Sequence, residues 1–224
     1  MTFKLTRMET AAGVVVLAQL ALAAYTTRFG VAGPVPMHFD MAGNVDRWGD
    51  RTQAAGVILI IAAITAACAG FMAFSLRRDG PDAARRRGLT LGMGITLAVT
   101  GAVALLPFLL ATPVFAPDQA GRLGGAFLCL ILTVVGALLG KVPPNAMIGV
   151  RTPWSLSSRM AWDRSNRLAG RLFFWGGLVG LPLTLLLPPA MAMGGVITAT
   201  LLIAVVVAFE SWRVWRADPD RRPV

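Results

Sequence analysis

Apolar and charged residues alternate along the chain in long blocks. Charged residues cluster between five uncharged, mainly apolar stretches, which cover residues 10–27, 52–76, 88–117, 123–140 and 172–209. A transmembrane helix needs about 20 apolar residues, so the first, second and fourth stretches predict one span each. The third predicts one span over 89–110, because Pro113 and Pro117 do not continue a helix. The fifth predicts two spans, 172–187 and 191–209, divided at Pro188-Pro189.

This block pattern predicts an all-α integral membrane protein, a bundle of six transmembrane helices. Strands of a membrane barrel alternate apolar and polar residues over about 10 positions, whereas these stretches are apolar throughout. The composition agrees: 14% of the residues are charged, against about 25% in soluble domains, and the mean hydropathy is +0.67. The first span contains Ala21-Leu22-Ala23, which resembles a signal-peptidase site, but its length and Glu9 favour a retained helix.

The basic residues are divided unevenly between the two ends of the predicted spans. Seventeen lie in segments on the side of the chain termini, and four lie on the opposite side. Because cytoplasmic loops are enriched in Lys and Arg, both termini are predicted to be cytoplasmic. The net charge of +10 then reflects topology and contact with anionic headgroups of the lipid bilayer. No nucleic-acid-binding motif accompanies the charge, so direct binding of nucleic acid is not expected.

Neither a cofactor nor a metal site is expected. The two cysteines, Cys68 and Cys129, lie inside predicted spans without His or Cys neighbours at metal-binding spacing. The predicted spans also lack the ionisable residues that mark ion pathways, which disfavours a proton-coupled pump or an ion channel.

A polar loop of residues 33–50 is predicted on the outer face, and two interpretations of it remain open. In the first, it forms a pH-sensitive or divalent-cation site from His38, Asp40, Asp46 and Asp50, with Asn44 as a further oxygen ligand. In the second, it is a compact, hydrogen-bonded loop with Trp48 at the level of the lipid headgroups. A mismatch to EF-hand spacing and the presence of a single His favour the second.

A second loop, residues 141–171, is predicted on the cytoplasmic face. Prolines at 143, 144 and 153 exclude a continuous helix through its first half. Ser157 or Ser158 is a suitable N-cap for a short helix over 159–169, in which Asp163 has i,i+4 partners in Arg159 and Arg167. The loop is either a linker lying in the membrane interface or a binding surface. The side chains suited to the interface are Trp154, Met160, Trp162 and Leu168.

This second loop resembles the signature of SdpI-type membrane proteins. In that pattern Gly-Lys precedes Pro-Asn, then come Ile-Gly-Ile-Arg-Thr-Pro-Trp-Thr-Leu, a Trp, and an Asn/His-Arg-Leu-Gly-Gly segment. The matching residues here are Lys141, Pro144-Asn145, Ile148-Gly149-Val150-Arg151-Thr152-Pro153-Trp154-Ser155-Leu156, Trp162, Asn166-Arg167-Leu168 and Gly170. The chain departs from the pattern at Pro143, commonly basic, at Ser155, usually Thr, and at Ala169, usually Gly. The loop of residues 33–50 is similar to a companion N-terminal module with Pro-x-Pro-x-His-Phe and Gly-x-x-Asp-x-Trp-Gly.

The resemblance implies two modules in a multi-pass protein of the bacterial plasma membrane. Residues 1–87 would form a two-helix module with the outer loop, and residues 88–224 an SdpI-like four-helix module with the cytoplasmic loop. The named member of the family gives immunity to a secreted toxic peptide and holds a soluble autorepressor, expected here to be a winged-helix protein, at the membrane. Residues expected to meet the peptide are Pro36, His38, Phe39, Asp40, Gly43, Asp46, Trp48 and Gly49. Residues expected to bind the repressor or to maintain the signature are Lys141, Pro144, Asn145, Gly149, Arg151, Thr152, Pro153, Trp154, Trp162, Asn166 and Arg167.

Two alternatives to immunity and signalling stay open. A small transporter would export the peptide, although no nucleotide-binding motif, charged relay or clear inverted repeat supports it. A membrane enzyme would use His38 with Asp40 or Asp46 as acid–base or metal groups. Because the outer loop offers neither Cys nor Ser as a nucleophile, an enzyme is not expected.

Overall fold

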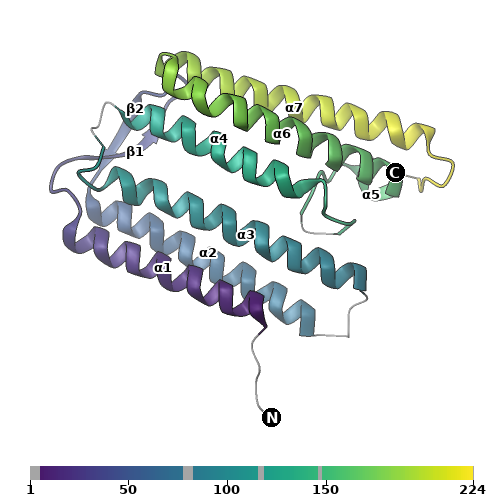
Figure 1. Ribbon diagram of the computed structural model, residues 1–224, viewed down its shortest axis with the longest axis horizontal. Helices are drawn as coiled ribbons and strands as arrows, with labels where there is room; N and C mark the ends of the chain where they lie inside the picture. The colour runs from purple at the N-terminus through teal and green to yellow at the C-terminus, as the bar shows by residue number, and fades with distance from the viewer. Residues whose placement is uncertain (1–5, 78–82, 116–118, 146–147, 224) are drawn as a thin grey trace, which may run out of the picture.

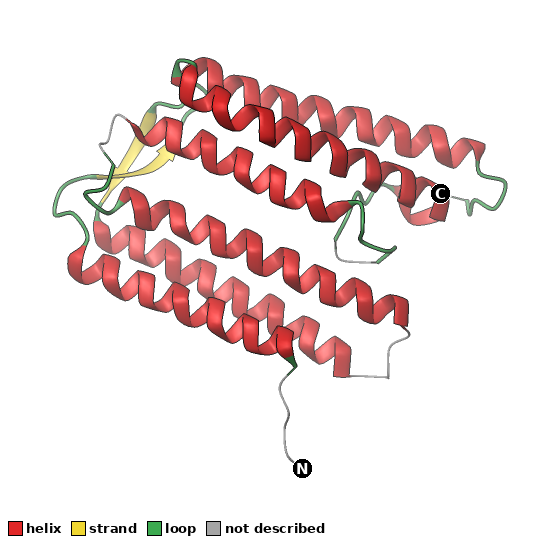
Figure 2. Cartoon of the chain, in the orientation of Figure 1, coloured by secondary structure: helices red, strands yellow, loops and turns green. Residues whose placement is uncertain are grey.

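The computed structural model describes residues 6–77, 83–115, 119–145 and 148–223. Among these residues, six helices are long and apolar enough to cross a membrane, which confirms the predicted all-α membrane bundle (Figures 1 and 2). In chain order the elements are α1 (Arg7–Phe29), β1 (Val35–Phe39), β2 (Val45–Gly49), α2 (Arg51–Arg77), α3 (Ala83–Leu110), α4 (Ala120–Leu139), α5 (Pro153–Ser157), α6 (Arg159–Leu186) and α7 (Pro189–Ala217).

The six long helices form two groups of three. Helices α1, α2 and α3 pack on one another, as do α4, α6 and α7, and the two groups meet mainly through α3 and α4 (Figure 1). The boundary predicted between residues 87 and 88 therefore falls inside α3, and the division into modules stays a prediction. The start of α1 and the end of α7 lie at one end of the bundle, and the β-hairpin lies at the other (Figure 1).

Helix α6 corrects the expected structure of the second loop. The predicted short helix over 159–169 and the predicted span over 172–187 are one continuous helix that begins at Arg159. The expected break rested on the charge of Arg171, and a charge marks the edge of the membrane without ending a helix. The predicted ion pairs are absent from the described part of α6, where Arg167 Nε instead donates to the Asp163 carbonyl oxygen at 3.0 Å.

Close backbone contact joins α4 to α6, which pack on each other extensively. Gly136 on α4 faces Gly170 on α6, and a Cβ added to Gly170 would lie 2.9 Å from the Gly136 carbonyl oxygen. Small residues permit such an approach in membranes, where packing and hydrogen bonds hold helices together.

The outer loop folds as a β-hairpin, which the sequence analysis did not anticipate. Strands β1 and β2 are antiparallel, with Val35 opposite Gly49 and Phe39 opposite Val45. A proline within an apolar run argues against a strand unless that strand is at a sheet edge, and a two-stranded hairpin consists of edges only. Pro36 is therefore compatible with β1, opposite Trp48.

Candidate functional site

The hairpin is anchored at its base in the helix bundle. Val35 is fully buried and packs with Ala54 of α2, Ala111 after α3 and Ala120 of α4. The neighbouring Pro36 is buried as well. Because the base is inserted among three helix ends, it anchors the hairpin to the bundle, and the buried Pro36 does not present a surface.

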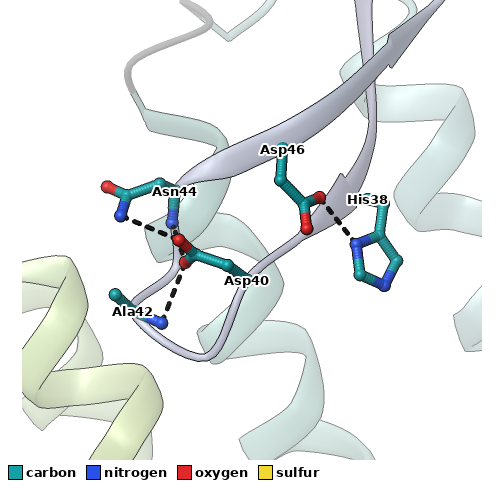
Figure 3. A network of polar contacts seen from close by, with 5 residues as sticks. All are labelled: His38, Asp40, Ala42, Asn44 and Asp46. Atoms are coloured by element: carbon teal, nitrogen blue, oxygen red, sulfur yellow. Dashed lines mark hydrogen bonds and ion pairs between the residues drawn. The ribbon is translucent and has the colours of Figure 1, made fainter.

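His38 and Asp46 form an exposed pair across the two strands (Figure 3). The Nδ1 of His38 lies 2.6 Å from Oδ1 of Asp46, and the side chains are 65% and 45% exposed. The interpretation of this loop as a pH-sensitive or cation site placed these residues near each other, and the hairpin brings the two side chains together. An exposed imidazole beside a carboxylate presents a polar, hydrogen-bonding surface to whatever lies outside the bundle.

Asp40 has a different role, within the turn of the hairpin. Its carboxylate accepts hydrogen bonds from the Asn44 side chain at 3.1 Å and from the backbone N–H groups of Asn44 at 2.8 Å and Ala42 at 2.9 Å (Figure 3). These donors, the Asn44 side chain foremost, hold the pKa of Asp40 below its ordinary value. The carboxylate therefore organises the turn, in which Gly43 adopts a positive φ of 79°.

Asp50 is separated from the other acidic residues because it caps a helix. Its carboxylate accepts from the Gln53 backbone N–H at 2.8 Å, at the start of α2, as an N-cap aspartate does. The three carboxylates proposed for a shared cation site therefore have separate partners. Asp46 pairs with His38, Asp40 accepts hydrogen bonds within the turn, and Asp50 caps α2. Within the described residues, no group of three or more His, Cys, Asp and Glu side chains is arranged to hold a metal ion.

The tip of the hairpin contacts helices that lie far away in the sequence. Gly43 lies against Gly121 at the start of α4, and a Cβ on Gly43 would lie 3.3 Å from the Pro189 carbonyl oxygen and 3.5 Å from Met193 Cβ on α7. Phe39 lies close to Gly124 on α4. The hairpin, although it follows α1 in the chain, is therefore packed against the second group of helices.

Trp48 and Gly49, the last two residues of β2, differ in their surroundings: Trp48 is exposed and Gly49 is closely packed. Trp48 is 47% exposed, in agreement with a position at the headgroup level or at a ligand. Gly49 lies so close to Met37 and Gln53 that a Cβ would overlap them, so it serves packing.

At the other end of the bundle, Asn145 shapes the start of the signature loop. Its Oδ1 accepts from the Ile148 N–H at 2.8 Å, and its Nδ2 donates to the carbonyl oxygens of Pro143 at 2.8 Å and Ile148 at 3.0 Å. Because proline has no backbone N–H, this segment cannot form the regular backbone hydrogen bonds of a helix. The Asn145 amide supplies hydrogen bonds to the backbone in their place.

Trp162 and Asn166 of α6 fasten the middle of the loop. Asn166 Oδ1 accepts from the Val150 N–H at 2.8 Å, and Trp162 Nε1 donates to the Val142 carbonyl oxygen at 3.0 Å. Between them Gly149 adopts a φ of 133°. Trp162, expected to lie in the membrane interface, is instead 1% exposed, because the loop folds back over it.

Thr152 links the loop to α7. Its Oγ1 caps α5 by accepting from the Ser155 N–H at 3.1 Å and lies 2.5 Å from Ser211 Oγ on α7. Ser155 Oγ donates to the Val150 carbonyl oxygen at 2.6 Å. Ser211 is fully buried and Thr152 is half-buried, so the contact is partly shielded from solvent.

A last contact joins the start of α6 to the segment after α7. Ser158 is the N-cap of α6, accepting from the Ala161 N–H at 2.9 Å, and its hydroxyl donates to the buried carboxylate of Asp218. This hydrogen bond, with a further one from the Asp220 N–H, holds the pKa of Asp218 below its ordinary value. The Arg222 N–H donates to the Ser157 carbonyl oxygen at 2.9 Å.

Ser211 and Asp218 belong to this network, although the sequence alone did not indicate them. Neither belongs to a motif, and each lies about 60 residues from its partner in the loop. The N-cap preference of Ser158 was the only signal, and it identifies the helix start without the carboxylate.

The remaining signature residues present a surface. Lys141, Pro144, Arg151, Pro153 and Arg167 are exposed, and Trp154 is half-buried. The signature therefore divides into residues that fold the loop onto α6 and α7 and residues that face outward from it.

The comparisons with known proteins concern this second end of the bundle. Residues 141–210 match the model of the SdpI/YfhL protein family, a segment that comprises the signature loop, α5, α6 and most of α7. No curated protein and no solved structure matches the chain. The similarity of the hairpin to a companion module stays a prediction. On the strength of the matched segment and of the signature residues folded together in it, residues 141–210 of this six-helix membrane protein are a domain of the SdpI/YfhL family.

Proposed function

We propose that the protein gives its host immunity to a secreted antimicrobial peptide and reports the presence of that peptide across the membrane. The observation that carries the proposal is the SdpI/YfhL family match over residues 141–210. In this proposal the peptide binds at the hairpin end of the bundle, outside the cell. The signature loop, on the cytoplasmic side, then holds a soluble winged-helix autorepressor at the plasma membrane.

The exposed side chains of the hairpin suit a peptide ligand. Trp48 offers a large amphipathic ring, and the His38–Asp46 pair offers hydrogen-bonding groups next to it on the same two strands. Tryptophan is among the residues that contribute most to binding at protein interfaces. A hairpin anchored in the bundle also loses little conformational entropy on binding, which favours affinity.

Helix α7 supplies a physical route between the two ends. Met193, in its first turns, lies against the hairpin tip, and Ser211, near its end, pairs with Thr152 of the signature loop. The two residues are about 27 Å apart along the helix axis. A ligand that shifts the hairpin would therefore move α7, and a coupling of about 1–3 kcal/mol is typical of such switches.

The outward-facing part of the signature loop suits a partner on the opposite side. Arg151 and Pro153 are exposed beside the half-buried Trp154. Arg and Trp are enriched at interfaces. Since the folding residues of the same loop are fastened to α7, a movement of that helix would change how these side chains are presented.

Challenge with the peptide tests the immunity half of the proposal. Deleting the gene should make the host more sensitive to antimicrobial peptides in its own spent medium, and the wild-type gene should restore resistance. Trp48→Ala should weaken peptide binding by roughly thirtyfold or more, and should resemble the deletion. Phe71→Ala, which removes a 57% exposed aromatic from α2, is the matched control and should retain resistance. Unchanged sensitivity of the deletion strain would overturn the proposal.

Co-purification tests the signalling half. The detergent-solubilised protein should retain a small DNA-binding repressor when isolated with spent medium and lose it without. Arg151→Ala should abolish the retention, whereas Arg122→Ala, an exposed arginine at the hairpin end, should not. Resistance without any repressor, together with lower peptide accumulation in the cells, would favour export over sensing.

A further inference from the structure

We propose that a groove between α4 and α6 is a binding site for one anionic phospholipid of the leaflet next to the chain termini. The groove has a volume of about 900 Å³. It begins at the end of the bundle that carries the signature loop and extends toward the membrane interior. The groove shares Lys141 and Arg167 with the signature residues, but its test measures lipid binding and is therefore independent of peptide immunity.

Four basic side chains converge on the outer half of the groove. Arg164, Arg167 and Arg171 line it from α6, and Lys141 lines it from the end of α4. The three arginines follow one another at spacings of three and four residues, which places them on one face of the helix. All four side chains are exposed. Within the described residues none of the four has a carboxylate at ion-pair distance, so their charges are available to a ligand.

The single acidic residue of the lining does not neutralise this cluster. Glu210 on α7 is engaged by Arg213, whose Nε and second guanidinium nitrogen donate to its two carboxylate oxygens at 2.8 and 2.9 Å. Four cations against one carboxylate that already has a partner leave the groove positive. A phosphate group complements this charge, and arginine matches its geometry with two parallel hydrogen bonds.

The inner half of the groove is apolar and suits the glycerol and upper acyl region of a lipid. Phe174 and Trp175 line it, with their rings in an edge-to-face arrangement 5.2 Å apart. On α4 the wall is formed by Gly136, Ala137 and Gly140, and the close backbone contact of Gly136 with Gly170 of α6 closes its floor. A charged outer end and an aromatic inner end match the two parts of a phospholipid and not a small soluble anion.

The depth of the groove agrees with this assignment. The hydrocarbon core is about 30 Å thick, which corresponds to about 20 helical residues. Counted back from Leu186 at the end of α6, this length reaches Arg167. Arg164 then lies about one turn outside the hydrocarbon and Arg171 about one turn inside, from where its side chain reaches the headgroups. Trp175, eight residues beyond Arg167, then lies about 12 Å inside the hydrocarbon, at the level of the acyl chains.

Retention of lipid through purification tests the site. Native mass spectrometry of the full chain, exchanged from nanodiscs of phosphatidylglycerol and phosphatidylcholine, should show one bound phosphatidylglycerol and no comparable phosphatidylcholine. The triple variant R164Q/R167Q/R171Q should lose affinity on the order of a hundredfold. The variant R28Q/R47Q/R122Q removes the same charge from exposed positions at the hairpin end, and should bind like the wild type. Equal loss in both triple variants would overturn the proposal, since bulk charge would then explain the binding.

Two further measurements distinguish the lipid from other occupants. Ala137→Trp fills the groove without altering charge and should displace the lipid, while R164K/R167K/R171K keeps the charge and should bind more weakly than the wild type. Retention by Ala137→Trp at the wild-type level would place the lipid elsewhere and overturn the proposal. Competition by inorganic phosphate or glycerol 3-phosphate at millimolar concentration would also overturn it, because the site would then serve a soluble anion.

Discussion

Replacing Gly149 by alanine should destabilise the signature loop strongly. At a φ of 133° an L-residue carries a backbone strain of about 1–3 kcal/mol. The new Cβ would also lie 2.7 Å from Trp162 Cη2 and 2.8 Å from Asn166 Oδ1. Both side chains are buried and hydrogen-bonded, so relief of the overlap is expected to cost a further 1–3 kcal/mol or so. The total is about 2–6 kcal/mol.

Thermal unfolding in detergent measures this loss. Cys129 is fully buried, so a thiol-reactive dye reports its exposure on unfolding, with Cys68 replaced by serine in every variant. At about 2–4 °C per kcal/mol for chains of this size, the lower bound corresponds to a decrease of about 4 °C in Tm. Gly56→Ala is the matched control, since nothing lies within 4 Å of its added Cβ, and it should leave Tm unchanged or raised.

The same assay refutes the reasoning if Gly149→Ala unfolds within 1 °C or so of the wild type, a change below about 0.5 kcal/mol. It also separates the two contributions. Trp162→Phe shortens the ring that the Cβ meets, so combining it with Gly149→Ala should give less destabilisation than the sum of the single changes. Strict additivity would assign the whole effect to backbone strain.

Three other changes address the contacts at the two ends of the bundle. Ser211→Ala should lower stability by about 0.6–2 kcal/mol, because Thr152 loses a buried interhelical partner, whereas Thr200→Ala, which removes only an intrahelical hydroxyl contact, should have a smaller effect in the same unfolding assay. The pKa of Asp218 is lowered by Ser158 from an ordinary value of 3.8, so its stabilisation is present above about pH 4 and is lost as the pH falls through the lowered value. A Tm series from pH 6 to pH 3 should decrease less in Asp218→Asn than in the wild type, and equal decreases would contradict this role. Gly121→Leu should detach the hairpin tip from α4 and increase proteolysis of the turn, and protection equal to that of the wild type would show that the contact is dispensable.

The spans were predictable because the length of a continuous apolar stretch must match the thickness of the membrane's hydrocarbon core. Leu110 ends α3 as the prolines after it indicate, and Pro188 divides the last two helices as expected. The start of α6 was not predictable from the same pattern. The segment Arg159–Arg171 is rich in charged residues and the chain from Leu172 onward is apolar. Both segments can form a helix, so the change from charged to apolar residues does not mark a helix boundary.

The sequence indicated some residues that lie together at the two ends of the bundle, but not how they are arranged. His38 and Asp46 were named together, and the hairpin brings their side chains within 2.6 Å, although His38 lies opposite Arg47 in the strand register. Asp40 and Asp50 belong to the same residue class, yet local hydrogen bonding to a turn and to a helix start separates them. The partners Ser211 and Asp218 lie far along the chain, and only the packing of α7 against the loop identifies them.

The contacts of the hairpin tip and of the signature loop impose an order on biogenesis. The hairpin emerges after the first span but completes its packing only when α4 and α7 have been made, because Gly43 contacts both. The signature loop likewise cannot complete its contacts until Ser211 and Asp218 have been made, about 60 residues after their partners Thr152 and Ser158. The nascent chain therefore inserts its early helices with both ends of the future bundle unfinished. The arrival of α7 supplies the missing contacts at both ends, so a chain truncated before α7 would leave both surfaces incompletely packed.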